Sequence, residues 1–322
     1  MIILKKIKAR LLNDYWPLWK LPLKFHSFWQ DRSYLEYLYK HKFKKNLDLA
    51  NPKTFNEKTQ WLKLYDQKPV YTQMADKYSV MDYVRKKIGE EYIIPILGVW
   101  NNFDEINFND LPNQFVLKCT HDSGGVVICI DKEKHIFRNK AGFTLSMRGV
   151  KRYFAKLMKI NYFYKLREWV YKNIKPRIIA QMYIGSSSGE PLNDYKIFTF
   201  NGRPKYIQAH FDKSSNQLKA NFYSTDWVFQ DFFIQEINDK NQKIEKPKLL
   251  DKMLESAGLL AEGTNFLRVD FFYINNKIYF GELTFYNWAG FGNFTPENYD
   301  EIFGSYITLP SEKTTESTIA GS

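Results

Sequence analysis

The chain has 322 residues, of which 44% are apolar and 17% are aromatic. A chain of this length and content can bury a substantial core, which excludes an intrinsically disordered protein. Forty-seven Lys and Arg residues against 35 Asp and Glu residues give a net charge of +12, which favours anionic partners such as nucleotides, acidic glycans or anionic lipids.

The sequence carries no sign of export or of a membrane span. Its N-terminus lacks a secretory signal, and no stretch reaches the roughly 20 apolar residues that cross a bilayer. Cys119 and Cys129 lie in neighbouring apolar stretches and predict buried free thiols rather than a disulfide. We therefore expect a cytoplasmic protein.

Residues 1–32 combine Lys and Arg residues with three tryptophans. Such a segment suits a membrane surface, but Pro17 and Pro22 interrupt a continuous membrane-lying helix. We favour an N-terminal helix that packs its aromatic side chains on the domain. Apolar spacing then predicts two short helices within 34–66, so residues 1–70 are expected to form a helical N-terminal region.

The rest of the chain predicts an α+β fold. Helices are expected at 71–87, 137–159 and 249–261. Strands are expected at 92–100, 115–119, 126–130, 177–184, 195–200, 206–210, 267–274 and 278–285. A Gly/Ser-rich connection at 185–189 follows the fourth of these strands, and the small, polar residues 311–322 predict an unstructured tail.

Lys118 occupies an unusual place for a charge, on a strand of buried type directly before a Ser-Gly-Gly loop. Strand alternation places Phe115, Leu117 and Cys119 on one face and Lys118 on the other. Glycine lets backbone N–H groups approach phosphate oxygens closely, and a lysine supplies the matching charge. An ordinary hairpin would show the same pattern, so a phosphate site needs corroboration from elsewhere in the chain.

That corroboration comes from the last predicted strand pair. A three-residue loop at 275–277 would place Asp270 opposite Glu282 and Arg268 opposite Thr284. Opposed carboxylates repel, and hard oxygen ligands of this kind suit Mg²⁺. A two-residue turn would instead put the carboxylates on opposite faces, and solvated edge charges are the alternative interpretation.

Together these motifs, Lys118 with its glycine loop, Arg268-Val-Asp270 and Gly-Glu282-Leu-Thr284, resemble the ATP-grasp superfamily. Five further segments resemble the TupA-like ATP-grasp family, which is linked to bacterial surface-polysaccharide and teichuronopeptide biosynthesis: 51–58, 61–66, 75–78, 193–196 and 280–285. The resemblance covers about residues 33–309. It implies two α+β lobes that clasp ATP within 71–309, with a small lobe at about 100–180, the remainder as the large lobe, and a flexible tail at 310–322.

The resemblance also implies roles for individual residues. The nucleotide-binding candidates are Lys77 and Lys118 for the phosphates, His121, Ser123, Gly124 and Gly125 in the loop, Gln181, Met182, Tyr183 and Ile184 for adenine, Asp194 for the ribose, and Lys219. The Mg²⁺ ligands are Asp270, Glu282 and Thr284, where Thr284 stands in place of the more usual asparagine, and the catalytic candidates are Arg268 and Lys196. His121 and His210 are alternative general bases, although a lone histidine is more often structural.

The function implied is that of an ATP-dependent carboxylate–amine ligase that works through an acyl phosphate. Its expected partners are a uronic acid of a capsule or O-antigen glycan and an amino acid or amine, with peripheral contact to the membrane or a lipid-linked glycan and no nucleic acid. The segment from Tyr286 to Gly290 departs from the family pattern, and its Trp288 could stack on a sugar ring. The alternatives are a glycan kinase or glycosyltransferase-type modifying enzyme on the same frame, and a non-catalytic glycan- or membrane-binding protein.

Overall fold

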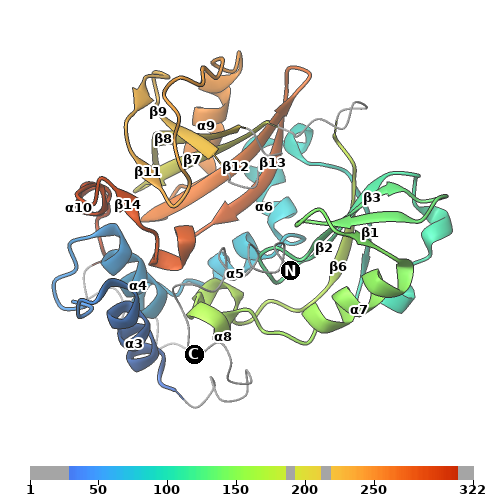
Figure 1. Ribbon diagram of the computed structural model, residues 1–322, viewed down its shortest axis with the longest axis horizontal. Helices are drawn as coiled ribbons and strands as arrows, with labels where there is room; N and C mark the ends of the chain where they lie inside the picture. Colours follow the sequence, from blue (N-terminus) through green and yellow to red (C-terminus); the bar gives the residue numbers. More distant parts are fainter. Residues whose placement is uncertain (1–28, 186–192, 212–218, 311–322) are drawn as a thin grey trace.

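The computed structural model describes residues 29–185, 193–211 and 219–310, and its strands form two six-stranded sheets in two facing lobes (Figure 1). Predictions for the N-terminal segment up to residue 28, most of the Gly/Ser-rich connection and the tail from residue 311 lie outside these residues. Within the described ranges, every helix is too short or too polar to span a bilayer.

The small lobe is an antiparallel sheet with one face covered by a helix. Its strands are β1 (Ile96–Trp100), β2 (Phe115–Cys119), β3 (Val126–Asp131), β4 (Ile136–Asn139), β5 (Thr144–Leu145) and β6 (Ile178–Met182), in the spatial order β1-β6-β2-β3-β4-β5. Phe115, Leu117 and Cys119 are fully buried against α7 (Met147–Leu157), while Lys118 lies on the other face, which confirms the predicted alternation.

The predicted helix at 137–159 is wrong up to residue 146. Asn139 folds the chain back through a turn, in which the Gly142 N–H donates to the Asn139 carbonyl at 2.8 Å, so β4 and β5 form a hairpin. The helix starts only at Met147, where the Ser146 hydroxyl caps it by accepting a hydrogen bond from the Gly149 N–H at 3.2 Å.

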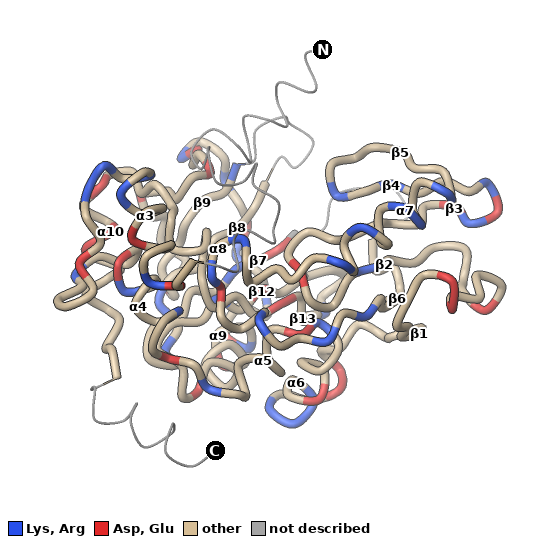
Figure 2. The backbone as a smooth tube through the Cα atoms, turned by 90° about the horizontal axis from the view of Figure 1, so that it is seen from below, with Lys and Arg blue, Asp and Glu red and all other residues tan. Residues whose placement is uncertain are grey.

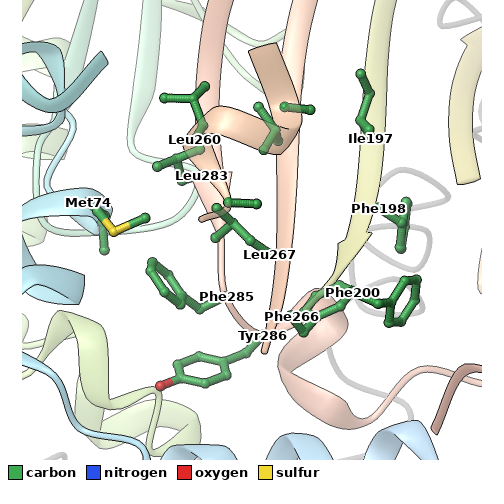
Figure 3. Close-up of a cluster of buried hydrophobic side chains, with 14 of the residues drawn as sticks. Met74, Ile197, Phe198, Phe200, Leu260, Phe266, Leu267, Leu283, Phe285 and Tyr286 are labelled. Atoms are coloured by element: carbon green, nitrogen blue, oxygen red, sulfur yellow. The ribbon is translucent and has the colours of Figure 1, made fainter. Parts of the chain in front are cut away.

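The large lobe is built on the second antiparallel sheet. Its strands are β7 (Asn193–Phe200), β8 (Arg203–Phe211), β9 (Lys219–Ser224), β10 (Phe229–Gln230), β12 (Phe266–Ile274) and β13 (Lys277–Thr284), in the order β10-β9-β8-β7-β12-β13. A separate pair joins β11 (Phe233–Ile234) to β14 (Phe294–Thr295). Helix α9 (Leu250–Leu260) packs on β7, β8 and β12, and Figure 3 shows the apolar side chains gathered beside these strands.

The remaining helices have between 4 and 13 residues. They are α3 (Asp31–Phe43), α4 (Phe55–Tyr65), α5 (Pro69–Ala75), α6 (Val80–Ile88), α8 (Phe163–Leu166) and α10 (Tyr299–Ser305), with 3₁₀ turns η2 (Glu90–Tyr92), η3 (Phe103–Glu105), η4 (Phe108–Asp110), η5 (Trp169–Tyr171) and η6 (Asn287–Gly290). A capping box fixes the start of α4, because the Thr54 side chain accepts from the Glu57 N–H and the Glu57 carboxylate accepts from the Thr54 N–H. The predicted helix at 71–87 is divided into α5 and α6.

The β12–β13 hairpin does not have the predicted three-residue turn. Asn275 and Asn276 both adopt left-handed backbone angles, with φ of 50° and 57°, and form a two-residue turn that pairs Ile274 with Lys277. Continued without interruption, this register would direct the two acidic side chains of the ribbon to opposite faces of the sheet.

A β-bulge at Gly281 restores the pairing. One extra residue in β13 shifts the register, so that Asp270 pairs with Glu282 and Arg268 pairs with Thr284. The predicted turn is therefore wrong, whereas the predicted opposition of the two carboxylates is confirmed. The bulge determines which side chains share the face on which the candidate site lies.

Candidate functional site

The open face of the small-lobe sheet carries Lys118 and Gln181 on neighbouring strands. Lys118 Nζ donates a hydrogen bond to Gln181 Oε1 at 2.7 Å. Three partly buried aliphatic side chains share this face, those of Val116, Val126 and Ile128. An apolar surface with one amine and one amide suits a flat heterocycle with a polar edge. The sequence analysis singled out the two polar residues and missed the aliphatic floor.

The loop between β2 and β3 needs glycine at two positions. Gly124 has a φ of 97°, and a Cβ at Gly125 would lie 2.3 Å from Asp122 Oδ2. Ser123 is exposed at the tip of this loop. The loop therefore offers backbone and hydroxyl groups at the edge of the open face.

His121 connects the same loop to helix α7. Its side chain is 2% exposed, and Nε2 donates to the Leu157 carbonyl at the end of α7, at 3.2 Å. Burial lowers the pKa of His121, although the hydrogen bond to Leu157 opposes this shift. A neutral, buried imidazole in this position supports the loop and does not suit a general base.

Lys77 lies in the break between α5 and α6, within the span where a single helix was predicted at 71–87. Its N–H donates to the Thr120 carbonyl at 3.2 Å, and its Nζ donates to the Asp122 carbonyl of the glycine loop. The break itself is held by an ion pair of 2.6 Å between Asp76 and Arg177. The glycine loop thus has a lysine at each side.

Lys140 is a cation that the sequence analysis did not single out. It follows β4 directly, in the turn that leads to β5, and its charge acts on Lys118 and Glu282. Burial, Lys77 and Lys140 together lower the pKa of Lys118 to about 8. Because a helix was predicted over this segment, its position beside the glycine loop could not be foreseen.

The predicted adenine hinge follows β6. Met182 is 44% exposed, and Tyr183 and Ile184 are partly buried. The N–H of Met182 already donates to the Pro95 carbonyl at 2.9 Å, so this donor is engaged within the protein.

Four charged side chains from three adjacent strands meet on one face of the large-lobe sheet. Lys196 pairs with Asp270, which pairs with Glu282. Both oxygens of Asp270 are bound, because Arg268 Nε donates to Oδ1 at 2.7 Å, while Arg268 Nη2 and Lys196 Nζ each donate to Oδ2 at 2.7 Å. Arg268 Nη2 also donates to Glu282 Oε1 at 3.3 Å.

Glu282 is the more accessible of the two carboxylates. Its side chain is 45% exposed, against 7% for Asp270. Partial burial raises the pKa of Glu282, but Arg268, Lys196, Lys77 and Lys140 outweigh this effect and lower the pKa to about 2. Lys77 and Lys140 belong to the glycine-loop side, so charges from that side act on this carboxylate of the large lobe.

These carboxylates fit the donor set of a nucleotide-bound Mg²⁺. Over the described ranges, no group of three or more His, Cys, Asp and Glu side chains could hold a metal ion. Mg²⁺ needs only one or two protein carboxylates when phosphates and water complete its shell. Asp270 and Glu282, opposed on adjacent strands, supply that number, and the charges of Arg268 and Lys196 now balance them.

Asp194 joins the same network through Lys196, and it connects His210 to it. Asp194 Oδ2 lies 3.3 Å from Lys196 Nζ and 3.2 Å from His210 Nδ1, and His210 Nε2 donates to Glu236 Oε2 at 2.6 Å. Burial lowers the pKa of His210, but its bonds to the two carboxylates outweigh burial and raise the pKa. A histidine held at both nitrogens does not suit a general base. Glu236 was missed, because it lies outside every motif.

The two remaining candidates are placed differently. Thr284 pairs with Arg268, next to the carboxylates along β13. Lys219 pairs with Phe211, and strand alternation directs it to the face opposite that of His210. The structure therefore does not bring Lys219 to the charged network.

One further contact completes the network. Arg268 Nη1 donates to Asn287 Oδ1 at 2.8 Å, and Asn287 is 2% exposed. Asn287 is the second residue of the segment from Tyr286 to Gly290, which departs from the expected family pattern. Figure 2 shows basic positions on both lobes, including the segments where they meet.

The chain was compared with known proteins. A family model described as TupA-like ATP-grasp matches residues 57–308, and no curated protein sequence matches the chain. Similar solved structures include D-alanine–D-alanine ligase from Bacillus anthracis complexed with ATP, at 15% identity and a TM-score of 0.36, with 66% of this chain and 53% of that chain covered. Another is L-amino acid ligase from Bacillus licheniformis, at 11% identity and a TM-score of 0.45, with 80% and 57% covered. N5-carboxyaminoimidazole synthetase from Staphylococcus aureus complexed with ADP has 11% identity and a TM-score of 0.37, with 74% and 53% covered. The chain thus spans little more than half the length of these proteins.

Proposed function

Because the chain belongs to the TupA-like ATP-grasp family, as the match over residues 57–308 shows, we propose that it is an ATP-dependent carboxylate–amine ligase. One observation carries this proposal: the Lys196–Asp270–Glu282 row with Arg268 faces a glycine loop flanked by Lys77 and Lys118. Anionic phosphates suit the lysine side, and a metal and a developing oxyanion suit the carboxylate and arginine side.

The site has places for both cofactors. Adenine would lie on the aliphatic face beside Gln181, and Asp194 is the candidate for the ribose. Asp270 and Glu282 would hold Mg²⁺, with Thr284 as a neighbouring hydroxyl, and the ion would supply charge that balances the phosphates.

The proposed reaction has two steps. A substrate carboxylate oxygen attacks the γ-phosphorus of ATP, the bond to the bridging β,γ-oxygen breaks, and ADP leaves with the electron pair. An amine then attacks the acyl carbon, loses a proton, and the C–O bond to phosphate breaks. Lys77 and Lys118 would neutralise phosphate charge, and Arg268, oriented by Asn287, would stabilise the oxyanion.

The substrates are proposed from charge and family. A net charge of +12 and the cations of the site favour an acidic carboxylate, such as a uronic acid of a surface polysaccharide or its lipid-linked precursor, with an amino acid or amine as the second substrate. Peripheral contact of the protein with the membrane is part of this proposal.

A product assay tests the reaction class. The protein is incubated with Mg-ATP, uronic-acid glycans and amines, and the products are weighed. Phosphate release that requires both carboxylate and amine supports the ligase, whereas a stable phosphosugar would show a kinase and overturn it.

Glu282→Gln tests the site itself. Loss of one metal-binding charge should lower kcat by at least about 100-fold, since a metal contributes several kcal/mol to transition-state stabilisation. The melting temperature should stay near that of the wild type, because the Glu282 side chain is 45% exposed. Glu262→Gln, at an exposed carboxylate paired with Lys87, is the matched control. Full activity of Glu282→Gln would remove the proposed site.

A further inference from the structure

The segment after β13 has an unusual backbone. Trp288 and Ala289 both adopt left-handed angles, with φ of 50° and 53°, and Gly290 follows with φ of 67°. A non-glycine residue in this region is disfavoured, and a bulky side chain is especially rare there. Two such residues in succession persist only where the surroundings hold them.

Helix α4 supplies the groups that hold this segment. Gln60 Nε2 donates to the carbonyls of Ala289 and Gly290 at 3.2 and 2.7 Å, and Lys63 Nζ donates to the Ala289 carbonyl at 2.7 Å. Asn56 brackets the next turn, because its amide donates to the Gly292 carbonyl at 2.9 Å and accepts from the Gly292 N–H at 3.2 Å.

These anchoring side chains are deeply buried. Asn56, Gln60 and Lys63 are each at most 1% exposed. Lys63 also donates to Gln60 Oε1 and to the Leu166 carbonyl, both at 2.9 Å, so all its hydrogens are engaged. The left-handed segment is therefore a fixed part of the site.

The held segment presents one large side chain to solvent. Asn287 and Ala289 are 2% and 6% exposed, whereas Trp288 between them is 42% exposed. Its neighbour Asn287 accepts a hydrogen bond from Arg268, which ties this segment to the charged network. An exposed indole contributes little to the core, so stability does not explain the strained conformation.

We infer that Trp288 is an aromatic platform for a sugar ring in the acceptor subsite beside Arg268. The apolar face of a pyranose packs on an indole ring, while its hydroxyl and carboxylate groups need polar and cationic partners. Gln208, Glu236 and Arg268 lie in the network next to this segment and offer such partners. The inference rests on the proposed function, since it names the ring that carries the reacting carboxylate.

Binding measurements test the platform without requiring turnover. A glucuronic acid oligosaccharide and a matched neutral glucose oligosaccharide are titrated by calorimetry and by tryptophan fluorescence, and Mg-ATP is titrated separately. Trp288→Ala should weaken binding of the acidic oligosaccharide at least about tenfold, since aromatic contacts of this kind contribute more than 1 kcal/mol. Trp288→Phe should retain most of the affinity.

Trp29→Ala is the matched control, because Trp29 is 40% exposed and packs edge-on against Tyr34 and Tyr37, away from the network. It should bind like the wild type, and Mg-ATP affinity and melting temperature should be unchanged in all three variants. Equal sugar affinity in Trp288→Ala and wild type would overturn the platform. So would a parallel loss of Mg-ATP affinity, which would indicate a merely structural role. Failure of the wild type to bind Mg-ATP would instead contradict the proposed ligase.

Discussion

Lys118 shows how burial prepares a side chain for its ligand. Burial, together with Lys77 and Lys140, lowers its pKa to about 8, so part of the population is neutral at slightly alkaline pH. An anionic phosphate beside the amine favours the charged form and would raise this pKa again. Ligand binding and proton binding are therefore coupled at this residue.

Nucleotide binding should take up protons. At pH 8 we expect uptake of about half a proton per ATP, since a group is half protonated at its pKa. Calorimetry in two buffers with different ionisation enthalpies measures this number, and Lys118→Met should abolish it. Uptake that persists in Lys118→Met would assign the proton to another group.

His210 makes a different prediction, for stability against pH. Its pKa is raised above 6.5 in the folded protein, so its contribution is fully present below about 6.5 and is lost as pH rises through the folded value. The pKa of Glu236 is lowered from 4.5, so its contribution is present above about 4.5 and is lost as pH falls through the folded value. The pair should stabilise most between these limits.

His210→Gln should lower the unfolding free energy at pH 5.5 by about 1–3 kcal/mol, as expected for charge-assisted hydrogen bonds, and by less at pH 8.5. Denaturant titrations at the two pH values measure the difference. His135→Gln, at an exposed position between β3 and β4, should change neither value appreciably. An equal loss at both pH values would show that protonation of His210 does not contribute.

At the scale of elements, the β12–β13 ribbon shows what sequence could and could not predict. The predicted pairing of Asp270 with Glu282 rested on strand alternation and on an assumed three-residue turn. The assumed turn was wrong, because Asn275 and Asn276 both tolerate left-handed angles, and the bulge at Gly281 compensates for it. A single glycine within a strand gives a weak signal, and a bulge depends on contacts across the sheet.

Gly281→Ala tests the bulge. A Cβ there would lie 2.9 Å from the Asp270 carbonyl oxygen and 3.3 Å from the Phe272 ring, so we expect a loss of about 1–3 kcal/mol and of activity. Gly149→Ala in α7 is the control, because its Cβ would make only an ordinary contact of 3.4 Å and should stabilise the helix slightly. Unfolding curves and kcat are measured for both variants. If Gly281→Ala changes neither stability nor kcat, the bulge does not require glycine at this position.

The other differences between the predicted and the observed elements also arise from long-range contacts. The β4–β5 hairpin has helical apolar spacing, but Asn139 folds it back and β3 pairs with it, which brings Lys140 to the site. The break at Asp76 depends on Arg177, 101 residues away. Local patterns therefore predicted most strands and the main charged residues. The β4–β5 hairpin and the break between α5 and α6 depend on partners from distant segments, which local patterns do not show.

At the scale of the whole molecule, the candidate site draws on both lobes. Residues between 77 and 287 contribute side chains to the site. Lys77 and Lys140, on the glycine-loop side, help to lower the pKa of Glu282 in the large lobe. A nucleotide held by both lobes should therefore stabilise the entire chain and not only one sheet.

Mg-ATP at about 100 times its dissociation constant should add about 2.7 kcal/mol of stability, which raises the melting temperature of a protein of this size by several degrees. ATP with EDTA should raise it less, and Lys77→Ala should reduce the shift. A scan of melting temperature against nucleotide concentration checks this. No shift with Mg-ATP would mean that the folded protein does not bind the nucleotide.

The contacts of α4 with the segment after β13 join residues 226 to 236 positions apart. During translation the helix leaves the ribosome long before its partners are made, and Gln60 and Lys63 must stay hydrated until then. Activity can consequently appear only once nearly the whole chain has emerged. A premature stop between the end of β6 and residue 287 would leave the strands that carry the glycine loop but not the residues that complete the site.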